Sequence, residues 1–580
     1  MNLIEALKLA KQPADHDVPE LGIVLACGFT PLHLQTYLHA YLRQQNPEHR
    51  IRIDTGIFGD LVGNLQQLRG TKIQAVVAVI EWSDIDPRLG FRNLGTWRAE
   101  HFADILESAE RQLARLTQAI TEIAVKVPCV CALPTLPLPP LFPQRTGQSG
   151  PEEMRLRCMV QNFGASLAEH TRVRLLSAPA LDEVSPHRER YDIRSDIMGG
   201  FPYKLSHAEG MAKLLAKLVQ THSPKKGLIT DLDDTLWSGI LGEIGVENIC
   251  WDLSGHALLH GLYQQFLASL ASSGILLGVA SKNDPQLVNL ALKRDDLLLS
   301  KECFYPVECH WSHKSESVAR ILKAWNIASD AVAFVDDSPM EIAQVQAEFP
   351  HLDCRLFPKD DPERVLQLLK DLRDSFGKSR ISEEDTLRLG SIRSAGTLKE
   401  VVPQGSASQE DFLRDSSAVI VFEITRSEDE RAFELINKTN QFNLNGRRFG
   451  EAEWSGYLGE ENAFLLSVQY EDKYSRLGKI AAILGKHQAH QLVVDSWVMS
   501  CRAFSRRIEH QCLNYLFEKF GVEEVLFDYQ ATERNGPLQE FLAQMTTTPL
   551  ASPVRLLRTH CAARLPSLFH QIKEFEHVRP

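Results

Sequence analysis

The stretch that decides the fold is Gly227-Leu228-Ile229-Thr230-Asp231-Leu232-Asp233-Asp234-Thr235, near the middle of the 580-residue chain. Its apolar start predicts a short buried strand, and the carboxylates of Asp231 and Asp233 follow at the strand's end. Residues two apart on an extended segment point to the same side. Such a pair suits one oxygen nucleophile and one acid/base beside Mg²⁺ and a phosphate group. The sequence therefore predicts a phosphoryl-handling site here.

Three more polar motifs follow downstream in a fixed order. Residues 274–280 predict a buried strand that ends at Ser281-Lys282-Asn283, and Lys314 begins a predicted helix. Residues 331–335 predict another strand, which ends at Asp336-Asp337. Open α/β sheets collect their ligands at the carboxyl ends of parallel strands, so we expect these side chains to converge there.

The four motifs together resemble the four signatures of the haloacid-dehalogenase superfamily. The resemblance implies that Asp231 is the nucleophile that takes the phosphoryl group and that Asp233 is the general acid/base. It also implies a phosphate-binding set and a Mg²⁺ set. The phosphate-binding residues would be Ser281, Lys314 and Asn283, and the Mg²⁺ residues would be Asp231, Asp336, Asp337 and, through its carbonyl, Asp233. The alternative is a decayed copy of this site without turnover.

The gaps between the motifs are short. The segment from Trp237 to Ser281 holds a flap and one helical pattern at 262–273, and the segment from Ser281 to Lys314 is also short. Neither has room for a large cap domain. We therefore expect a core without such a cap, whose site admits a bulky or protein-borne substrate.

Longer stretches narrow the resemblance. Residues 231–243, Trp311-Ser312-His313-Lys314-Ser315 and 334–339 look like the FkbH-type enzymes of polyketide pathways. Residues 436–444 and Met499-Ser500-Cys501-Arg502 are similar to two further signatures of that family. The resemblance covers about residues 227–520 with specific motifs, and the N-terminal part more loosely.

The FkbH-type resemblance implies a bifunctional reaction. The triose 1,3-bisphosphoglycerate would supply a glyceryl unit, phosphate would be removed, and the acyl group would pass to the phosphopantetheine thiol of an acyl carrier protein. Three other functions stay open. They are a stand-alone phosphatase for a small phosphate ester, a carrier-docking module without turnover, and an N-acyltransferase that uses coenzyme A.

Acyl transfer requires a relay thiol or a pocket for the carrier's thiol, and Cys501 is the candidate for the relay. Residues 491–499 alternate as a strand and residues 507–520 follow a helical pattern, so Cys501 is expected in the turn between them. The N–H groups of the helix N-terminus, together with Arg502, Arg506 and Arg507, would favour its thiolate. The alternative is a buried structural cysteine.

This C-terminal module resembles the Gcn5-related acetyltransferase fold, in which the corresponding turn cradles the pyrophosphate of coenzyme A. Ser505 and Arg507 stand where the FkbH-type pattern usually has glycine, so close backbone approach is in doubt. An amide-rich run upstream is expected to end a helix and bind a polar substrate or the carrier arm. Its members are Asn437, Thr439, Asn440, Gln441 and Asn443, and the alternative is a capped loop.

The N-terminal part alternates predicted strands and helices, as in an α/β layer fold. Cys27-Gly28-Phe29-Thr30 occupies the strand-to-helix corner where hydrolases of the SGNH type have a serine. Asp196 and His207 are loosely similar to the acid and base of that fold. Because no serine stands at the corner, a non-catalytic docking domain is expected, with Thr30 as a weaker nucleophile candidate.

Composition limits the remaining possibilities. The net charge of −12 argues against wholesale nucleic-acid binding, and no apolar run is long enough to span a bilayer. The N-terminus lacks a secretory apolar region, and the 11 scattered cysteines fit a reducing cytoplasm. The expected domains are an SGNH-like one at 1–222, a haloacid-dehalogenase-like one at 223–378, a linker at 379–415 and an acetyltransferase-like α+β domain at 416–580.

Overall fold

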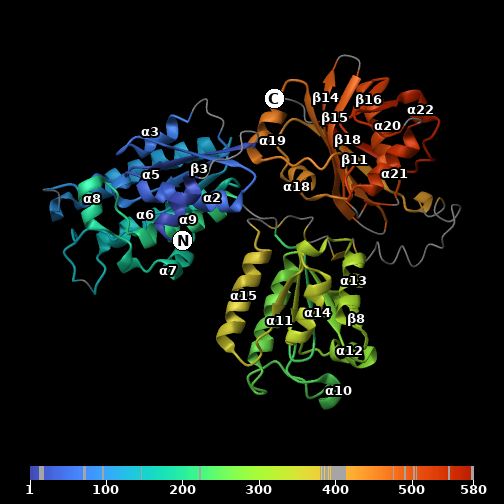
Figure 1. The fold of residues 1–580 in the computed structure, drawn as a ribbon, viewed down its shortest axis with the longest axis horizontal. Helices are drawn as coiled ribbons and strands as arrows, with labels where there is room; N and C mark the ends of the chain where they lie inside the picture. The colour runs from blue at the N-terminus through green and yellow to red at the C-terminus, as the bar shows by residue number, and fades with distance from the viewer. Residues whose placement is uncertain are drawn as a thin grey trace. The chain divides into compact units, whose positions relative to one another are not determined.

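The computed structural model describes residues 1–11, 18–68, 73–94, 97–145, 147–220, 224–378, 413–473, 476–488, 491–500, 503–504, 506–546 and 549–576, together with residues 381, 385, 389–390, 392 and 410. The chain forms two compact units. One comprises Met1–His222 with Gly450–Gly456, and the other comprises Ser223–Phe449 with Tyr457–Pro580. Figure 1 shows the elements of both units.

The N-terminal unit contains a five-stranded parallel sheet in the order β2-β1-β3-β4-β5. Its strands are β1 (Glu20–Cys27), β2 (Arg50–Thr55), β3 (Ala75–Val79), β4 (Cys129–Ala132) and β5 (Val173–Leu175). The helices are α1 (Leu3–Lys11), α2 (Leu32–Gln45), α3 (Leu61–Gln66), α4 (Trp82–Ile85), α5 (Phe102–Ala124), α6 (Pro151–Ala168), α7 (Ala178–Val184), α8 (Ile193–Gly199) and α9 (Leu205–Val219).

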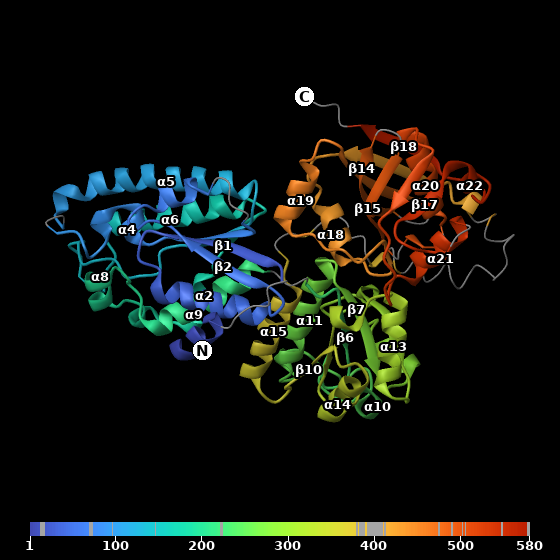
Figure 2. The ribbon, with the colours of Figure 1, turned by 45° about the horizontal axis from the view of Figure 1, so that its top comes forward.

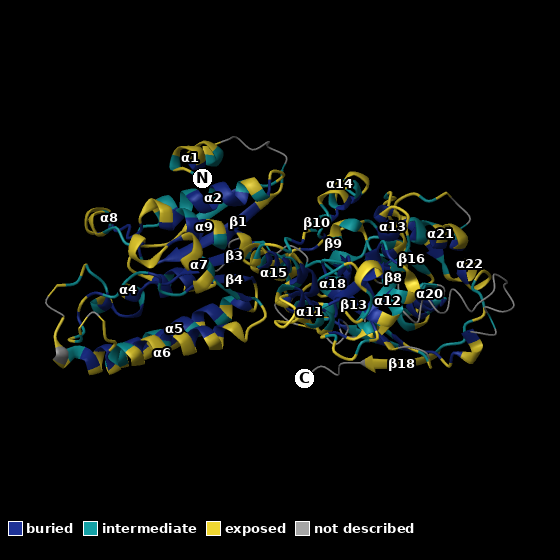
Figure 3. Cartoon of the chain, turned by 90° about the horizontal axis from the view of Figure 1, so that it is seen from below, coloured by how far each residue is buried: buried dark blue, intermediate teal, exposed yellow. Residues whose placement is uncertain are grey.

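Both faces of this sheet are covered by helices, which explains its nearly unbroken apolar strands. Val76 and Ala78 of β3 pack in the core beneath α3, α5 and α6. Their neighbours Val77 and Val79 pack on the opposite face, against α1, α2 and α9. Figure 3 shows that α5 and α6 keep their buried residues on one side and their exposed residues on the other.

The second unit begins with another five-stranded parallel sheet, in the order β10-β9-β6-β7-β8. The strands are β6 (Gly227–Thr230), β7 (Leu276–Ser281), β8 (Phe304–Cys309), β9 (Val332–Asp336) and β10 (Asp353–Leu356). Six helices surround it, as Figure 2 shows for most of them. They are α10 (Leu241–Ile244), α11 (Leu258–Ser272), α12 (Pro285–Ala291), α13 (Lys314–Trp325), α14 (Pro339–Glu348) and α15 (Pro362–Phe376).

The connections of this sheet are small. Between β6 and β7, single bridges join Asp233 to Trp237 and Ser238 to Cys250, and only α10 and α11 follow. Between β8 and α13 lie four residues, 310–313. All of these residues are described, and neither connection contains a cap-sized domain.

The rest of the second unit is an eight-stranded mixed sheet, in the order β17-β16-β15-β14-β13-β11-β18 with β12 beside β15. Its strands are β11 (Val419–Thr425), β12 (Phe442–Asn443), β13 (Ala463–Glu471), β14 (Arg476–Gln488), β15 (Gln491–Met499), β16 (Glu524–Phe527), β17 (Val554–Leu557) and β18 (Gln571–Glu576). Its helices are α18 (Glu430–Lys438), α20 (Ile508–Phe520), α21 (Gly536–Met545) and α22 (Arg558–Ala562), while most of α19 (Glu451–Leu458) belongs to the first unit.

The mixed α/β class with parallel sheets, predicted from the sequence, is confirmed by the first two sheets. In the third sheet, the antiparallel strands β13, β14 and β15 are followed by a parallel partner, β16. None of the described helices has both the length and the apolarity needed to cross a bilayer.

Trp325, at the end of α13, fixes how that helix lies on the second sheet. Its indole is buried, and its Nε1 donates to the Tyr305 carbonyl at 2.5 Å. A Cβ on Gly227 of β6 would lie 2.4 Å from this ring, and one on Gly278 of β7 would lie 2.9 Å from it. Two glycines on adjacent strands thus form the recess that seats α13, the helix that begins at Lys314.

Gly227→Ala should destabilise this sheet by about 1–3 kcal/mol, because a rigid, buried indole leaves no room for the added methyl group. We expect faster amide exchange in β6 and α13, measured by hydrogen–deuterium exchange mass spectrometry. The matched control is Gly242→Ala, whose Cβ would meet no atom within 4 Å. Equal exchange rates in the two variants would contradict this account of the recess.

Candidate phosphoryl-transfer site

Asp231 and Asp336 lie side by side because their strands pair in register. Thr230 of β6 is paired with Val335 of β9, and the next residue on each strand is one of the two aspartates. The chain runs from β6 to β7 and β8 on one side and returns to β9 and β10 on the other, so the β6–β9 pair is where the connections change direction. Open parallel sheets bind ligands at this position.

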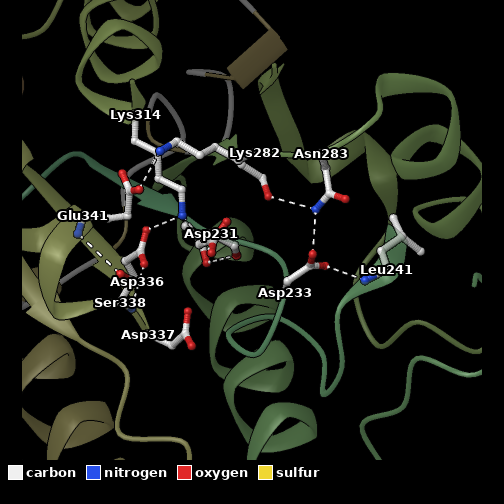
Figure 4. Close-up of polar contacts among 12 residues, drawn as sticks. Asp231, Asp233, Leu241, Lys282, Asn283, Lys314, Asp336, Asp337, Ser338 and Glu341 are labelled. Atoms are coloured by element: carbon white, nitrogen blue, oxygen red, sulfur yellow. Dashed lines mark hydrogen bonds and ion pairs between the residues drawn. The ribbon is translucent and has the colours of Figure 1, made fainter. Parts of the chain in front are cut away.

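Lys314 lies between the two carboxylates, as Figure 4 shows. Its Nζ is 2.8 Å from Asp231 Oδ2 and 2.6 Å from Asp336 Oδ2. All three side chains are nearly inaccessible to solvent. The lysine supplies the positive charge that two adjacent buried carboxylates require.

The protonation equilibria reflect this crowding. Burial raises the pKa of Asp231 to about 7; the Lys314 ammonium opposes this shift and the Asp336 charge adds to it. Burial also raises the pKa of Asp336 above its usual range. Burial alone would lower the pKa of Lys314, but the two carboxylates outweigh it and raise that pKa.

One oxygen of Asp231 remains open for chemistry. Its Oδ1 is buried, and no hydrogen bond from the described residues reaches it. Its backbone N–H donates to the Val335 carbonyl at 2.9 Å, which holds the residue at the end of the sheet. A buried polar atom of this kind is costly unless a ligand, ion or water satisfies it.

Asp233 is held by a separate set of donors. Its Oδ1 accepts from Trp237 Nε1 at 3.0 Å and from the Leu241 N–H at 3.2 Å. Its Oδ2 accepts from Asn283 Nδ2 at 3.0 Å, and the same amide donates to Ser281 Oγ at 3.2 Å. The flap and the end of β7 therefore orient this carboxylate together, as Figure 4 shows for Leu241 and Asn283.

Three carboxylates form a candidate metal centre. Asp231, Asp336 and Asp337 each offer an oxygen, and these atoms all lie within 4.8 Å of one another. Carboxylate oxygens are the ligands that Mg²⁺ prefers. The donor set thus fits a hard divalent cation.

Two lysines near the site were missed by the sequence analysis as site residues. Lys359 Nζ lies 3.0 Å from Asp337 Oδ2 and 2.6 Å from Asp234 Oδ2, so it orients Asp337. Lys282 Nζ lies 2.7 Å from Glu341 Oε1. Lys359 follows β10, so the convergence of parallel strand ends could have identified it. Lys282 belongs to a predicted motif but was given no role.

The amide-rich run of the third sheet is engaged within the protein. Asn437 exchanges two hydrogen bonds with the Phe449 backbone, and Gln441 exchanges two with Asn326. Asn443 donates to the Thr439 carbonyl at 2.9 Å. The remaining member, Asn440, accepts from Arg448 at 2.5 Å. These hydrogen bonds are those of a capped loop, and contact of the run with a polar substrate or the carrier arm stays a prediction.

The turn between β15 and α20 is described only in part. Cys501, Arg502 and Ser505 lie outside the described residues. Arg506 is buried, with its Nε 3.6 Å from Asp472 Oδ2 and its guanidinium 5.5 Å from the Tyr470 ring centroid. Arg507 has a φ of +58°, a left-handed conformation that favours glycine.

The three N-terminal candidates have separate partners. His207 is buried between the hydroxyls of Ser185 (2.9 Å) and Thr135 (3.1 Å), and burial lowers its pKa to about 3. Thr30 Oγ1 donates to the Gly199 carbonyl at 2.9 Å, and Asp196 accepts from the Tyr191 hydroxyl at 3.0 Å. Among the described residues, no hydrogen bond joins any of these three side chains to another, so the geometry gives no support to a triad.

Comparison with known proteins shows a similarity of fold. No protein-family model and no curated protein matches the chain. Among solved structures, it is similar to the N-terminal part of the protein BF1531 from Bacteroides fragilis, described as containing a phosphatase domain complexed with Mg. The similarity covers 66% of this chain and 100% of that one, with 15% identity and a TM-score of 0.52. At this identity, the comparison shows a shared fold.

Lys314→Met should cost about 3–5 kcal/mol in metal-free buffer, because it leaves two buried carboxylates without a counter-charge. Lys282→Met is the matched control, because Lys282 is about a third exposed and also pairs with one carboxylate, at a cost of about 1 kcal/mol or less. Amide exchange of β6 and β9 in the presence of EDTA measures the difference. Equal protection in both variants would show that Lys314 does not hold the carboxylates together.

Proposed function

We propose that this protein is a Mg²⁺-dependent phosphoryl-transfer enzyme in which Asp231 takes the phosphoryl group. The observation that carries the proposal is the open, buried Oδ1 of Asp231 beside a lysine and two further carboxylates. A free carboxylate oxygen is a competent nucleophile, and the neighbouring ammonium neutralises a phosphate that approaches it. The fold shared with a solved phosphatase domain supports this assignment.

Asp233 is the general acid/base of the proposal. Its three donors orient the carboxylate. It would protonate the leaving oxygen and then remove a proton from the water that releases phosphate. Ser281, Asn283 and Lys314 would bind the phosphate oxygens.

Mg²⁺ is the proposed cofactor, held by Asp231, Asp336 and Asp337 with the Asp233 carbonyl. When bound, the cation would neutralise charge that accumulates on the transferring phosphoryl group. Lys359 keeps Asp337 turned toward this group of carboxylates. The solved domain of similar fold is described as a complex with Mg.

The more specific proposal is that the enzyme transfers a glyceryl group from 1,3-bisphosphoglycerate to the phosphopantetheine thiol of an acyl carrier protein. The motif resemblance and the small connections around the sheet support it, because an uncapped site admits a substrate carried by a protein. Cys501 is the proposed relay: its thiolate would attack the acyl carbon and form a thioester as the acyl phosphate leaves as inorganic phosphate. The carrier thiolate would then attack this thioester, take the glyceryl group and release the Cys501 thiolate. Arg502 and Arg506, with the Asn437–Asn443 run, are the proposed contacts of the carrier arm.

The second candidate function is a stand-alone phosphatase for a small phosphate ester. It is favoured by the position of the site, since every side chain proposed for phosphoryl transfer and metal binding comes from one sheet and its connections. A carrier-docking module without turnover is the remaining alternative.

Asp231→Asn should reduce phosphate release from acetyl phosphate by about a thousandfold or more, because an amide is a poor nucleophile. The assay measures inorganic phosphate with Mg²⁺ and again after EDTA, which should abolish the activity of the unchanged protein. Asp360→Asn, at an exposed position, is the control and should retain activity. Undiminished release by Asp231→Asn would exclude Asp231 as the nucleophile, and no release by the unchanged protein would favour the docking-module function.

Incubation with Mg²⁺, 1,3-bisphosphoglycerate and a phosphopantetheinylated carrier protein should add one glyceryl group to the carrier, detected by intact mass spectrometry. Cys501→Ser should lower the loading rate by about a hundredfold or more if the thiol is the relay, because a serine hydroxyl is not ionised at neutral pH. Phosphate release without any carrier adduct would favour the stand-alone phosphatase. Loading at the original rate by Cys501→Ser would remove the relay thiol from the mechanism.

A further inference from the structure

The N-terminal unit contains a cavity of about 710 Å³ that the proposed phosphoryl transfer does not use. It opens at the carboxyl ends of β1 and β3. In the order β2-β1-β3-β4-β5, the chain leaves β1 toward β2 on one side and continues with β3 to β5 on the other. The β1–β3 boundary is therefore the place where such a sheet binds ligands.

The corner after β1 lacks room for a nucleophilic side chain. A Cβ on Gly28 would lie 1.7 Å from Asp84 Oδ1, so the Asp84 carboxyl occupies the space beside that glycine. The nearest hydroxyl along the chain, that of Thr30, donates to Gly199 instead. The architecture is that of a binding cavity, and it does not support hydrolysis.

Asp84 forms the polar base of this cavity. Its Oδ2 accepts from the Glu81 N–H at 2.8 Å, while Oδ1 faces Gly28. Glu81 is already satisfied by donors from Thr135, Leu136 and Tyr203, so its carboxylate is part of the framework. Burial raises the pKa of Asp84 to about 7, which lets this carboxyl tolerate a nearby anion.

Aromatic side chains line the walls. They come from the ends of β1 and β3 and from the loops opposite, and they are Phe29, Phe58, Trp82, Phe91 and Tyr191. The rings of Phe91 and Tyr191 stack with their centroids 4.7 Å apart. Walls of this kind bind a planar apolar body through its faces.

One face of α5 supplies cationic groups at the mouth. Ser108, Arg111, Gln112 and Arg115 all line the cavity, and their spacing of three, four and seven residues places them on one stripe of the helix. Gln112 Nε2 donates to the Asp84 carbonyl at 3.2 Å, so this face of α5 contacts the base of the cavity. Arg111 and Arg115 are exposed and lie one helical turn apart. Arg111 Nη1 pairs with Glu107 Oε1 at 2.9 Å and Arg115 Nη1 donates to Gln112 Oε1 at 3.2 Å, and each guanidinium has further N–H donors for an entering anion.

We propose that this cavity binds a small planar organic anion, with its anionic group on Arg111 and Arg115, its body between the aromatic walls and an N–H or O–H donor on the Asp84 carboxyl. The volume is that of a typical small-molecule site. The proposal is independent of phosphoryl transfer, since the cavity and the Asp231 site lie in different units.

The test is binding of 8-anilinonaphthalene-1-sulfonate to the full-length protein, followed by fluorescence. This probe combines a planar aromatic body, a sulfonate and one N–H donor. We expect saturable binding at one site and a rise in Kd of about tenfold in the Arg111→Ala/Arg115→Ala double variant. N-phenyl-1-naphthylamine, which lacks the sulfonate, should bind both proteins equally. Asp84→Asn should weaken both probes, because it replaces an acceptor oxygen facing the cavity.

Arg155→Ala is the matched control, since Arg155 is exposed on α6 and does not line the cavity. Hydrogen exchange locates the probe independently of these variants, with protection expected in residues 81–93 and 108–115. No saturable binding, protection elsewhere in the chain, or an unchanged Kd in the double arginine variant would each overturn the proposal. Phosphatase activity enters none of these measurements, so their failure is distinguishable from failure of the proposed function.

Discussion

The arrangement of the phosphoryl site depends on one buried ammonium group. Lys314 lies within 2.8 Å of Asp231 and Asp336, and without it the two carboxylates would repel each other in a medium that screens charge poorly. Burial of an ion pair gains little stability by itself. Its value here is positional: the lysine keeps one oxygen of each aspartate engaged and leaves Asp231 Oδ1 open.

This ammonium is in place only because α13 is seated on the sheet at its far end. Trp325 fills the recess above Gly227 and Gly278, and Lys314 begins the same helix. Because the helix is rigid, the packing of Trp325 at one end fixes the position of Lys314 at the other. The geometry of the site is thus tied to apolar packing about three helical turns away.

In both parallel sheets, the candidate ligand site lies at the same position in the strand order. In each, the first strand has later strands on both sides, and the site lies where the connections diverge. The second sheet gathers three carboxylates there, which suits a divalent cation. The cavity of the N-terminal sheet instead places aromatic rings and the arginines of α5 around the Asp84 carboxyl, which suits the proposed organic anion. Topology sets where a ligand binds, and the strand-end residues set which ligand.

The sequence by itself determined the class of fold and the motif residues of the phosphoryl site. Buried parallel strands are continuous apolar runs, so β3, β4, β7, β9 and β15 could be located to within two residues. Asp231, Ser281, Lys314 and Asp336 stand at element ends, where local sequence already implies convergence. The short strands β2, β5, β8, β10 and β16 to β18, all but β16 at a sheet edge, were missed because partial exposure weakens their pattern.

Only the tertiary structure decided which side chains pair. Lys359 reaches Asp337 across 22 residues, Asn283 reaches Asp233 across 50, and Asp84 fills the corner beside Gly28 from the end of another strand. Likewise, the His207 ring hydrogen-bonds to the hydroxyls of Ser185 and Thr135 and does not face a nucleophile. Hydrogen bonds and ion pairs act over about 3 Å in space regardless of sequence separation, so the hydrophobic periodicity of the sequence does not reveal them. They become definite once the sheets are assembled and the helices are seated.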